Sequence, residues 1–339
     1  MIGTEFLKGQ GLGNQLFCYV SARCIATDLG CEFGTAGQEQ LAVNVHSRKG
    51  MYFMDMDLGS PVSAISGFDI YREAETRLYL KNCVHDMAYG CYTAGADENL
   101  YKIGDNTLIY GNLQAQRYFF HHKEEIKKWL KVKEEYDSCE FTKDNLCIMN
   151  VRGGEYVDNR SLFLRRKYWL DAMKNMRSIR RDMEFMIVTD DVEAAERLLP
   201  EIPARHFDLA KDYVTIKNAR YLILSNSTFA FFPAFTSETA KRIIAPKYWA
   251  RHNVSDGYWA SEQNIYEDFI YQDRKGMLFT AGECREELEE YKKKEEARKV
   301  GRDSDKRYGE KEIKRQAVKD RMLYYTDKAV RKARRLLKF

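Results

Sequence analysis

The chain has 339 residues, of which 44% are apolar and 31% charged, and this composition excludes a disordered chain and favours a globular protein of about two domains. The formal net charge is +4, but the segment from Arg285 onward holds 20 Lys+Arg against 12 Asp+Glu, so residues 1–284 carry a net charge of −4. The body of the protein is therefore not expected to bind polyanions, and no nucleic-acid partner is expected.

No apolar run approaches the roughly 20 residues that a membrane-spanning helix needs. The N-terminus shows no basic region followed by an apolar core, and the eight cysteines are scattered without a Cys-x-x-Cys pair. These features predict a reduced, cytoplasmic location.

The N-terminal segment combines a short strand, a glycine-rich loop and a helix. The strand is predicted over Ile2–Leu7 and the helix over Gln15–Leu29, with Gly11, Gly13 and Asn14 between them. Glycines at such a junction let backbone amides approach a ligand closely, and a helix N-terminus favours an anion such as phosphate. A plain tight turn explains the same residues, so both interpretations stay open at this point.

Strands and helices alternate over residues 145–250, and one strand and one helical stretch precede them. Strands are predicted at Thr107–Tyr110, Leu146–Val151, Phe185–Thr189, Tyr221–Leu224 and Arg242–Ala245, and helices at 122–132, Arg166–Met176, Val192–Leu199 and Phe229–Glu238. This alternation predicts an α/β fold with a parallel sheet, in which ligands bind beyond the carboxyl ends of the strands.

A first polar cluster follows the strand at 146–151 and contains Asn150, Arg152 and Glu155. A guanidinium at such a strand end can hold a diphosphate through paired hydrogen bonds at any working pH. Glu155 is the first candidate for a general base and Asp158 the second. A surface salt-bridge turn is the alternative reading of this loop.

A second polar cluster, Asp190 and Asp191, follows the strand at 185–189. Adjacent carboxylates can bind a ribose diol or a metal ion, and either can instead cap the helix that follows. Both roles remain open from the sequence.

A third polar cluster, Asn226, Ser227 and Thr228, lies at the start of a predicted helix. Hydroxyls and amides there form another phosphate cradle or act only as helix caps. The carboxylate of Asp212, which precedes this cluster, can accept hydrogen bonds from the N1–H and exocyclic amine of guanine.

The six histidines show no metal-ligand spacing, and the pair His121-His122 lies near a predicted helix start. The sequence therefore predicts no metal and no other cofactor.

The tail, 285–339, is helix-forming and highly charged, and its last segment places Val330, Ala333 and Leu337 on one face with arginines around them. Two interpretations remain: a solvated helix that packs on the body, or a basic amphipathic helix on an anionic membrane surface.

Taken together, the motifs resemble the bacterial α-1,2-fucosyltransferase family, glycosyltransferase family 11. Five motifs occur in the family's order. They are Gly11–Tyr19, Gly111–Phe119, Asn150–Tyr156, Thr189–Asp191 and Asn226–Phe235, with Ile244–Trp249 after them.

The resemblance implies a GT-B-like fold, in which two Rossmann-type lobes face a cleft, with a C-terminal helical tail. The N-terminal lobe would span 1–138 and face the acceptor, the nucleotide-sugar lobe would span 139–284, and the tail would follow. It also implies a GDP-β-L-fucose donor, a galactoside-containing glycan acceptor and no metal. Arg152 would hold the phosphates and Asp212 would read guanine.

Three departures from the family pattern occur in one loop: Asn150 replaces a histidine, Gly153 a second arginine and Glu155 an aspartate. They leave open a different nucleotide-sugar donor or a degenerate, non-catalytic relative. A scaffold protein that acts through its basic tail is a further alternative.

The candidate site residues divide into a catalytic and a substrate-binding set, with no metal ligands. The catalytic candidates are Arg152, Glu155 and Asn14, and the substrate-binding candidates are Gly11, Gly13, Asn150, Asp190, Asp191, Asp212, Asn226, Ser227 and Thr228. The expected location is the cytoplasm. Peripheral contact of the tail with the inner face of the cell membrane stays open from the sequence.

Overall fold

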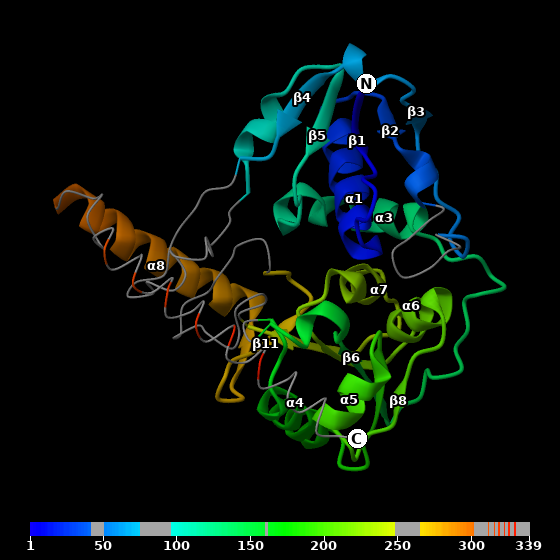
Figure 1. Ribbon diagram of the computed structural model, residues 1–339, viewed down its shortest axis with the longest axis vertical. Coiled ribbons are helices and arrows are strands. Elements are labelled where there is room, and N and C mark those ends of the chain that lie inside the picture. The colour runs from blue at the N-terminus through cyan, green and yellow to red at the C-terminus, as the bar shows by residue number, and fades with distance from the viewer. Residues whose placement is uncertain are drawn as a thin grey trace.

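The computed structural model describes residues 1–41, 51–74, 96–159, 162–247 and 265–301, and the single positions 311, 315, 318, 322, 325 and 329. Two α/β lobes lie one above the other in Figure 1, the N-terminal lobe in blue to cyan and the C-terminal lobe in green to yellow. Each lobe is built on one mainly parallel sheet.

The N-terminal lobe has a sheet with the strand order β3-β2-β1-β5-β4, in which all pairs are parallel. Its strands are β1 (Ile2–Glu5), β2 (Phe33–Ala36), β3 (Ser60–Pro61), β4 (Asp69–Arg72) and β5 (Thr107–Tyr110). Its helices are α1 (Leu12–Asp28), η1 (Gln38–Leu41), η2 (Ile65–Gly67), η3 (Glu98–Lys102), η4 (Gln116–Tyr118), η5 (Phe120–His122) and α3 (Lys123–Trp129). Most of α1 is buried, as expected for a helix that is apolar nearly all round.

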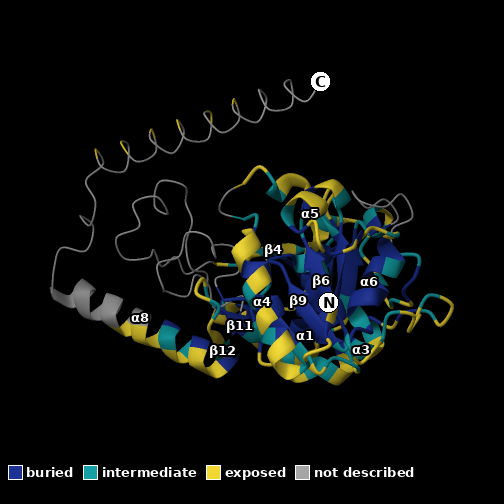
Figure 2. Ribbon diagram, turned by 90° about the horizontal axis from the view of Figure 1, so that it is seen from below, coloured by how far each residue is buried: buried dark blue, intermediate teal, exposed yellow. Residues whose placement is uncertain are grey.

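The C-terminal lobe has a seven-stranded sheet with the order β12-β11-β10-β9-β6-β7-β8, parallel except for the edge strand β12. Its strands are β6 (Leu146–Val151), β7 (Glu184–Thr189), β8 (Ala204–Arg205), β9 (Tyr221–Leu224), β10 (Arg242–Pro246), β11 (Ile270–Gln272) and β12 (Leu278–Thr280). Its helices are η6 (Gly154–Tyr156), α4 (Arg166–Ile179), α5 (Val192–Leu198), α6 (Leu209–Lys217), η7 (Thr228–Ala230), α7 (Phe231–Phe235) and α8 (Ala281–Gly301). Figure 2 shows β6 and β9 buried in the centre, while α4 carries one exposed face.

The predicted α/β fold class is confirmed, and three strands occupy the predicted ranges. One predicted helix is wrong in extent: 229–238 is a 3₁₀ turn followed by the short helix α7, which ends at Phe235. The chain has to reverse and enter β10 at Arg242, so only six residues remain after α7. The helix after the glycine loop begins at Leu12, because the second half of the loop is itself helical.

An interlobe aromatic cluster joins the two lobes. It consists of Phe17, Phe119, Phe231, Phe232, Phe235 and Tyr266. The ring of Phe17 in α1 stacks on that of Phe231 in α7, with centroids 4.8 Å apart and planes at 23°. Both lobes contribute to one continuous hydrophobic core, so this interface holds their relative orientation.

The first turns of α8 belong to the body, because Cys284 and Leu288 are buried in the same core. The helix then projects away from the lobes in Figure 1. The predicted amphipathic segment at 330–339 lies outside the described residues. Within the described part of the chain, no helix has the length and apolar character needed to cross a bilayer.

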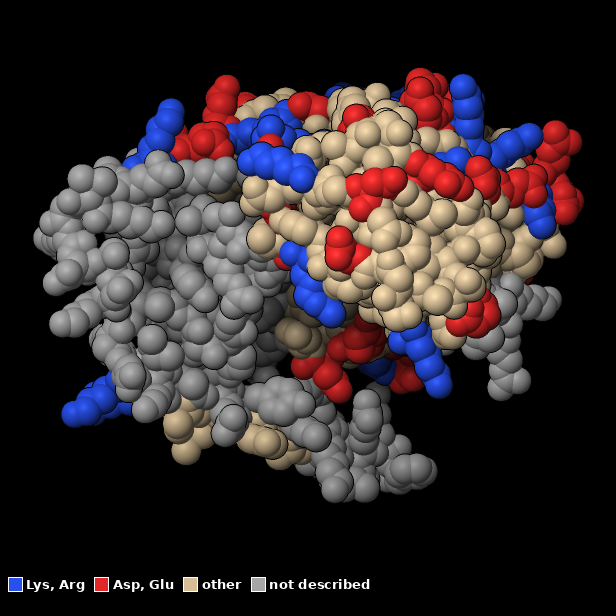
Figure 3. Space-filling view, turned by 90° about the horizontal axis from the view of Figure 1, so that it is seen from above, with Lys and Arg blue, Asp and Glu red and all other residues tan. Residues whose placement is uncertain are grey.

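Figure 3 looks onto the end of the molecule formed by the N-terminal lobe. Acidic and basic side chains are interspersed there around a broad neutral area. Within the described part of this face the charges are mixed in sign, in keeping with the small net charge of residues 1–284.

Candidate active site

A cavity of about 390 Å³ lies where the carboxyl ends of strands from both sheets meet. The loops that follow β1, β6, β7 and β9 all line it. In the C-terminal lobe the chain runs from β6 through β7 to β8 on one side, and β9 lies on the other side of β6. The cavity therefore lies at a topological switch point, the usual ligand position in such sheets. Two parallel-sheet lobes facing a cleft is the GT-B-like arrangement that the resemblance implied, and that prediction is confirmed.

The glycine loop brings the N-terminus of α1 to this cavity. Gly11 is the N-cap, and the first intrahelical bond runs from the Gln15 amide to the Gly11 carbonyl at 3.0 Å. The preceding helix amides have no intrahelical acceptor and point out of the helix end, where an anion is favoured. Asn14, exposed at the same end, accepts a hydrogen bond from the Gln114 side chain at 3.4 Å.

Gly13 is required by the packing of the two lobes. A Cβ atom at this position would lie 2.2 Å from the carbonyl carbon of Thr228 and 2.4 Å from the Phe229 nitrogen. The absence of a side chain thus allows α1 to touch the η7 turn of the other lobe. The two candidate phosphate cradles are in direct contact before any ligand binds.

Arg152 is the central cation of the cavity, and its side chain is 15% exposed. Its Nη1 donates to Asp190 Oδ2 at 2.6 Å, and its Nη2 donates to both oxygens of Glu155 at 2.7 and 2.8 Å. Burial lowers the pKa of Arg152, but the two carboxylates outweigh burial, so the pKa is raised overall. The guanidinium also lies over the Tyr156 ring, 5.6 Å from its centroid. Both terminal nitrogens of the guanidinium are therefore bonded to protein carboxylates.

The two adjacent aspartates have different roles. Asp190 binds Arg152 through one oxygen and accepts the Gly153 amide at 2.8 Å through the other. Asp191 is the N-cap of α5 and accepts the Ala194 amide at 2.9 Å. Asp190 thus positions the loop at residues 152–156, called the arginine loop below. Asp191 has the capping role that the sequence left open.

Packing explains why a glycine, Gly153, stands where the family has a second arginine. A Cβ atom there would lie 2.4 Å from the Cβ atom of Asp191. Its neighbour Gly154 has a φ of +45°, a region that side chains disfavour, and a Cβ atom there would lie 2.7 Å from Asp190 Oδ2. In this chain the loop lies directly against the end of β7, and a larger residue at 153 would move it away.

Asn150 connects three strands at the floor of the cavity. Its Oδ1 accepts from the Ser225 hydroxyl at 3.1 Å, and its Nδ2 donates to the Val188 carbonyl at 3.4 Å. A neutral amide can be satisfied on both sides here without carrying charge. The family's histidine is thus replaced by a buried residue that links β6, β7 and β9.

Asp212 lies on α6 at the far side of the cavity and is paired with a histidine. Its Oδ2 is 2.7 Å from His206 Nδ1, and its Oδ1 accepts the Phe207 amide at 3.1 Å. Burial raises the pKa of Asp212 from 3.8 to about 6, although the Phe207 amide and His206 act in the opposite direction. The carboxylate is therefore ionised at neutral pH but protonates in mild acid.

The loop after β9 contributes three residues to the cavity wall, Ser227, Thr228 and Phe229, at the start of η7. Asn226 is turned away from the cavity, and its Nδ2 donates to the Leu162 carbonyl at 3.0 Å. Its main-chain carbonyl accepts from the Tyr156 hydroxyl at 3.4 Å.

The structure brings ten of the twelve candidate residues to one cavity wall. They are Gly11, Gly13, Asn14, Asn150, Arg152, Glu155, Asp190, Asp212, Ser227 and Thr228. Asp191 and Asn226 are not among the residues that line it, and neither is the second candidate base, Asp158.

Three further residues line the cavity that the sequence motifs did not indicate: His206 and the apolar residues Leu209 and Phe229. His206 follows β8, a strand of two residues that carries no periodic pattern, and α6 was not predicted either. The signal available for His206 was Asp212, six residues later. The pairing of the two side chains becomes visible only when the chain has folded.

Comparison with known proteins places the chain in a family. A model described as Glycosyl transferase family 11 matches residues 70–272. An α-1,2-colitosyltransferase of Escherichia coli is 27% identical over 160 residues, which are 41% of this chain and 54% of that protein. The chain thus matches about half the length of this curated relative.

Solved structures also resemble the chain. The α-1,6-fucosyltransferase NodZ, soaked with GDP-fucose, gives a TM-score of 0.44 at 11% identity, over 74% of this chain and 96% of that one. Another NodZ structure is described as coming from Bradyrhizobium. POFUT1 in complex with GDP gives a TM-score of 0.41 at 11% identity, over 72% of this chain and 97% of that one.

The family model covers more than half of the chain and includes the arginine loop, the paired aspartates and the η7 turn. The chain therefore belongs to glycosyl transferase family 11.

Proposed function

We propose that this protein is an inverting fucosyltransferase that moves L-fucose from GDP-β-L-fucose to the 2-OH of a galactoside in a glycan acceptor. The observation that carries the proposal is the convergence of Arg152, the N-terminus of α1 and the η7 turn on one cavity. This is the set of fixed positive groups that a departing diphosphate needs. Membership of glycosyl transferase family 11 supports the reaction class.

The proposed reaction is a single displacement. The acceptor hydroxyl oxygen forms a bond to the anomeric carbon while the bond from that carbon to the GDP oxygen breaks. The leaving diphosphate keeps the electron pair, and the hydroxyl proton passes to a protein base. Arg152 and the amides at Gly11, Gly13 and Ser227 stabilise the charge that builds on the diphosphate. Fixed cations and helix ends supply the positive field, so the proposal needs no metal ion.

Glu155 is the first candidate for the base, because it lines the cavity and Asp158 does not. Its carboxylate is held and oriented by Arg152. When the diphosphate binds Arg152, that ion pair has to loosen, and the carboxylate is then free to accept the hydroxyl proton.

Asp212 is proposed to recognise guanine. A carboxylate has four lone-pair sites, and two of them already accept from His206 and the Phe207 amide. The remaining sites match two parallel donors, which guanine offers and uracil and cytosine do not. Calorimetric titration of the protein with GDP, UDP and CDP tests this role, and equal affinity for all three would contradict it.

A different donor sugar is the second candidate function. The relative from Escherichia coli is an α-1,2-colitosyltransferase, and the arginine loop of this chain departs from the family pattern at Asn150 and Gly153. Under this alternative the nucleotide contacts are kept and the sugar differs. A related degenerate protein would bind nucleotide without turnover.

The test is turnover of GDP-fucose and of GDP-activated colitose with a panel of galactosides, with and without chelator, followed by NMR of the product. Transfer of fucose to the galactose 2-OH with inversion supports the proposal. Transfer of colitose alone selects the second candidate. Nucleotide binding without transfer from any donor to any acceptor overturns both in favour of a non-catalytic relative.

A cytoplasmic location and a peripheral membrane contact through the tail are further parts of the proposal. Truncation after residue 301 is the suitable variant, because a cut at residue 285 would remove the buried Leu288. Flotation with anionic vesicles compares the two chains. Equal flotation would exclude the tail as an anchor, and lost turnover in solution would point instead to a function that resides in the tail.

A further inference from the structure

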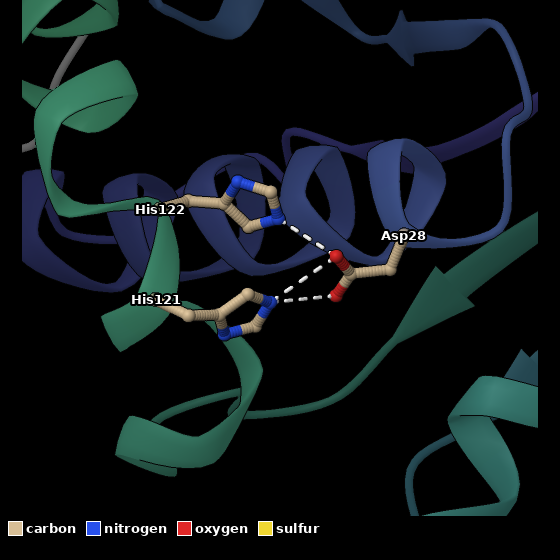
Figure 4. Close-up of side chains that lie close together, drawn as sticks. All are labelled: Asp28, His121 and His122. Atoms are coloured by element: carbon tan, nitrogen blue, oxygen red, sulfur yellow. Dashed lines mark hydrogen bonds and ion pairs between the residues drawn. The ribbon is translucent and has the colours of Figure 1, made fainter.

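A cluster of metal-ligating side chains lies in the N-terminal lobe, away from the cavity. Asp28 is the last residue of α1, and His121 and His122 end the 3₁₀ turn η5 that leads into α3. Figure 4 shows both imidazole rings pointing at the same carboxylate from the neighbouring segment. The three residues come together although 93 positions separate Asp28 from His121.

The donor atoms converge closely. His122 Nε2 lies 2.8 Å from Asp28 Oδ1, and His121 Nε2 lies 2.9 Å from Oδ2 and 3.1 Å from Oδ1. One ligand atom from each residue lies within 4.8 Å of the others. Ligands bound at about 2.0–2.1 Å in a tetrahedral zinc site lie about 3.3 Å apart, so a small relaxation of these side chains would seat an ion.

The surroundings favour a cation and hold the ligands in place. The carboxyl end of a helix carries partial negative charge, and Asp28 adds a full one there. The ring of His122 packs beside that of Trp129, with centroids 6.3 Å apart, and its side chain is only 14% exposed. His121 is 50% exposed, so the cluster is open to solvent on its side.

We infer that Asp28, His121 and His122 form a binding site for one divalent transition-metal ion of the zinc class. Two imidazoles and one carboxylate make a borderline N/O donor set, which suits Zn²⁺ and Co²⁺ and not Mg²⁺. Water from the exposed side completes the coordination. The ion links the carboxyl end of α1 to the start of α3, so it acts as a structural clamp within the N-terminal lobe.

The clamp is separate from the cleft. The residue at the other end of α1, Leu12, lies in the cavity wall, and the 1.5 Å rise per residue puts the two ends about 24 Å apart. The inference therefore does not depend on the proposed transferase reaction, which needs no metal. Metal binding and sugar transfer are measured separately, and either can fail without the other.

The experiment uses the full, untagged chain, stripped of metal with a chelator and exchanged into chelator-free buffer. Calorimetric titration with Zn²⁺ gives stoichiometry and affinity, and titration with Mg²⁺ is the comparison. Co²⁺ titration followed by visible absorption reports the coordination geometry. The variants are Asp28→Asn and His121→Asn, with His206→Asn as the matched control, because His206 also pairs with an aspartate but lies in the cleft.

We expect one Zn²⁺ per chain, no measurable Mg²⁺ binding at the same site, and intense Co²⁺ bands of four-coordinate geometry. Asp28→Asn and His121→Asn each weaken Zn²⁺ binding by about 10-fold or more, whereas His206→Asn leaves it unchanged. Zn²⁺ should also raise the Tm of the parent chain and not that of Asp28→Asn.

Absence of Zn²⁺ binding by the parent chain overturns the inference, and so does binding that survives both clamp variants. Loss of Zn²⁺ binding in His206→Asn alone would place the ion in the cleft, and this result would also contradict the inference. Because the parent titration and the Co²⁺ spectrum need no variant, the inference stays testable even if a substitution impairs folding.

Discussion

At the scale of single residues, Arg152 carries most of the proposed chemistry. Replacing it with alanine removes the guanidinium that lines the cavity together with both phosphate cradles, and it leaves Asp190 and Glu155 without their cation. We expect turnover to fall by about 10²–10³-fold, as for other preorganised donors to a developing anion. Arg152→Lys should recover only part of this loss, because an ammonium cannot serve two partners in a planar fork.

The measurement is initial-rate turnover of the donor, with Arg180→Ala as the matched control. Arg180 also forms a bidentate pair with a carboxylate, that of Asp182, but it lies outside the cavity wall. A parent-like rate for Arg152→Ala would remove the arginine from the mechanism.

Asp212 gives a prediction about pH. Its pKa is raised from 3.8 to about 6 by burial, so between these values the folded chain holds a proton that the unfolded chain has released. The free energy of unfolding that Asp212 contributes is therefore present below about pH 4 and is lost as the pH rises through 6. Over that window we expect the stability of the parent chain relative to Asp212→Asn to fall by up to about 3 kcal/mol.

Urea unfolding of both chains between pH 4 and pH 7.5 measures this difference at each pH. Titrating groups that do not contact Asp212 cancel in the comparison, because their surroundings are the same in the two chains, whereas His206 pairs with Asp212 and contributes to the difference. A difference that is constant with pH, or that grows as the pH rises, would mean that the carboxyl is not desolvated in the folded state.

At the scale of elements, the contact between α1 and η7 yields a matched pair of glycine substitutions. Gly13→Ala places a Cβ atom 2.2 Å from the Thr228 backbone, whereas a Cβ atom at Gly11 meets no atom within 4 Å. Gly11 has a φ of −67°, which any residue can adopt. We expect Gly13→Ala to destabilise the fold by about 1–3 kcal/mol through overpacking.

Chemical denaturation of the two variants checks this prediction, with Gly11→Ala expected to stay close to the parent in its midpoint. If the two midpoints shifted equally, the close approach of the lobes at Gly13 would not be real.

Much of the element order was predictable, because buried parallel strands such as Leu146–Val151 are continuous apolar runs. The short strands Ser60–Pro61 and Ala204–Arg205 were not, since two residues carry no periodicity. The glycine and arginine loops were recognised from local chemistry. The pairing of His206 with Asp212 and of Asp28 with His121 was not, because only tertiary contacts bring these residues together.

At the scale of the whole molecule, the lobes share one hydrophobic core and should unfold as one unit. Phe17→Ala tests this coupling, because its fully buried ring stacks on Phe231 of the other lobe. We expect a loss of about 3–5 kcal/mol with the transition remaining single. Met277→Ala, at a side chain that is 61% exposed, is the control and should change little.

Calorimetry and denaturant titration followed by two probes measure both quantities. Two separate transitions in the parent chain would show that the lobes are energetically independent. This shared core could not be predicted from the sequence, since Phe17 and Phe231 lie 214 positions apart and each is only one apolar residue among many.

The occupied fork of Arg152 has a consequence for the catalytic cycle. Glu155, whose side chain is 65% exposed, occupies Nη2 of the guanidinium, and an anion that binds there has to displace its carboxylate. Binding and release of the nucleotide then exchange one anionic partner of Arg152 for another, so the guanidinium stays paired throughout. Glu155→Gln should accordingly slow the departure of bound nucleotide, which stopped-flow displacement would record as a longer residence time.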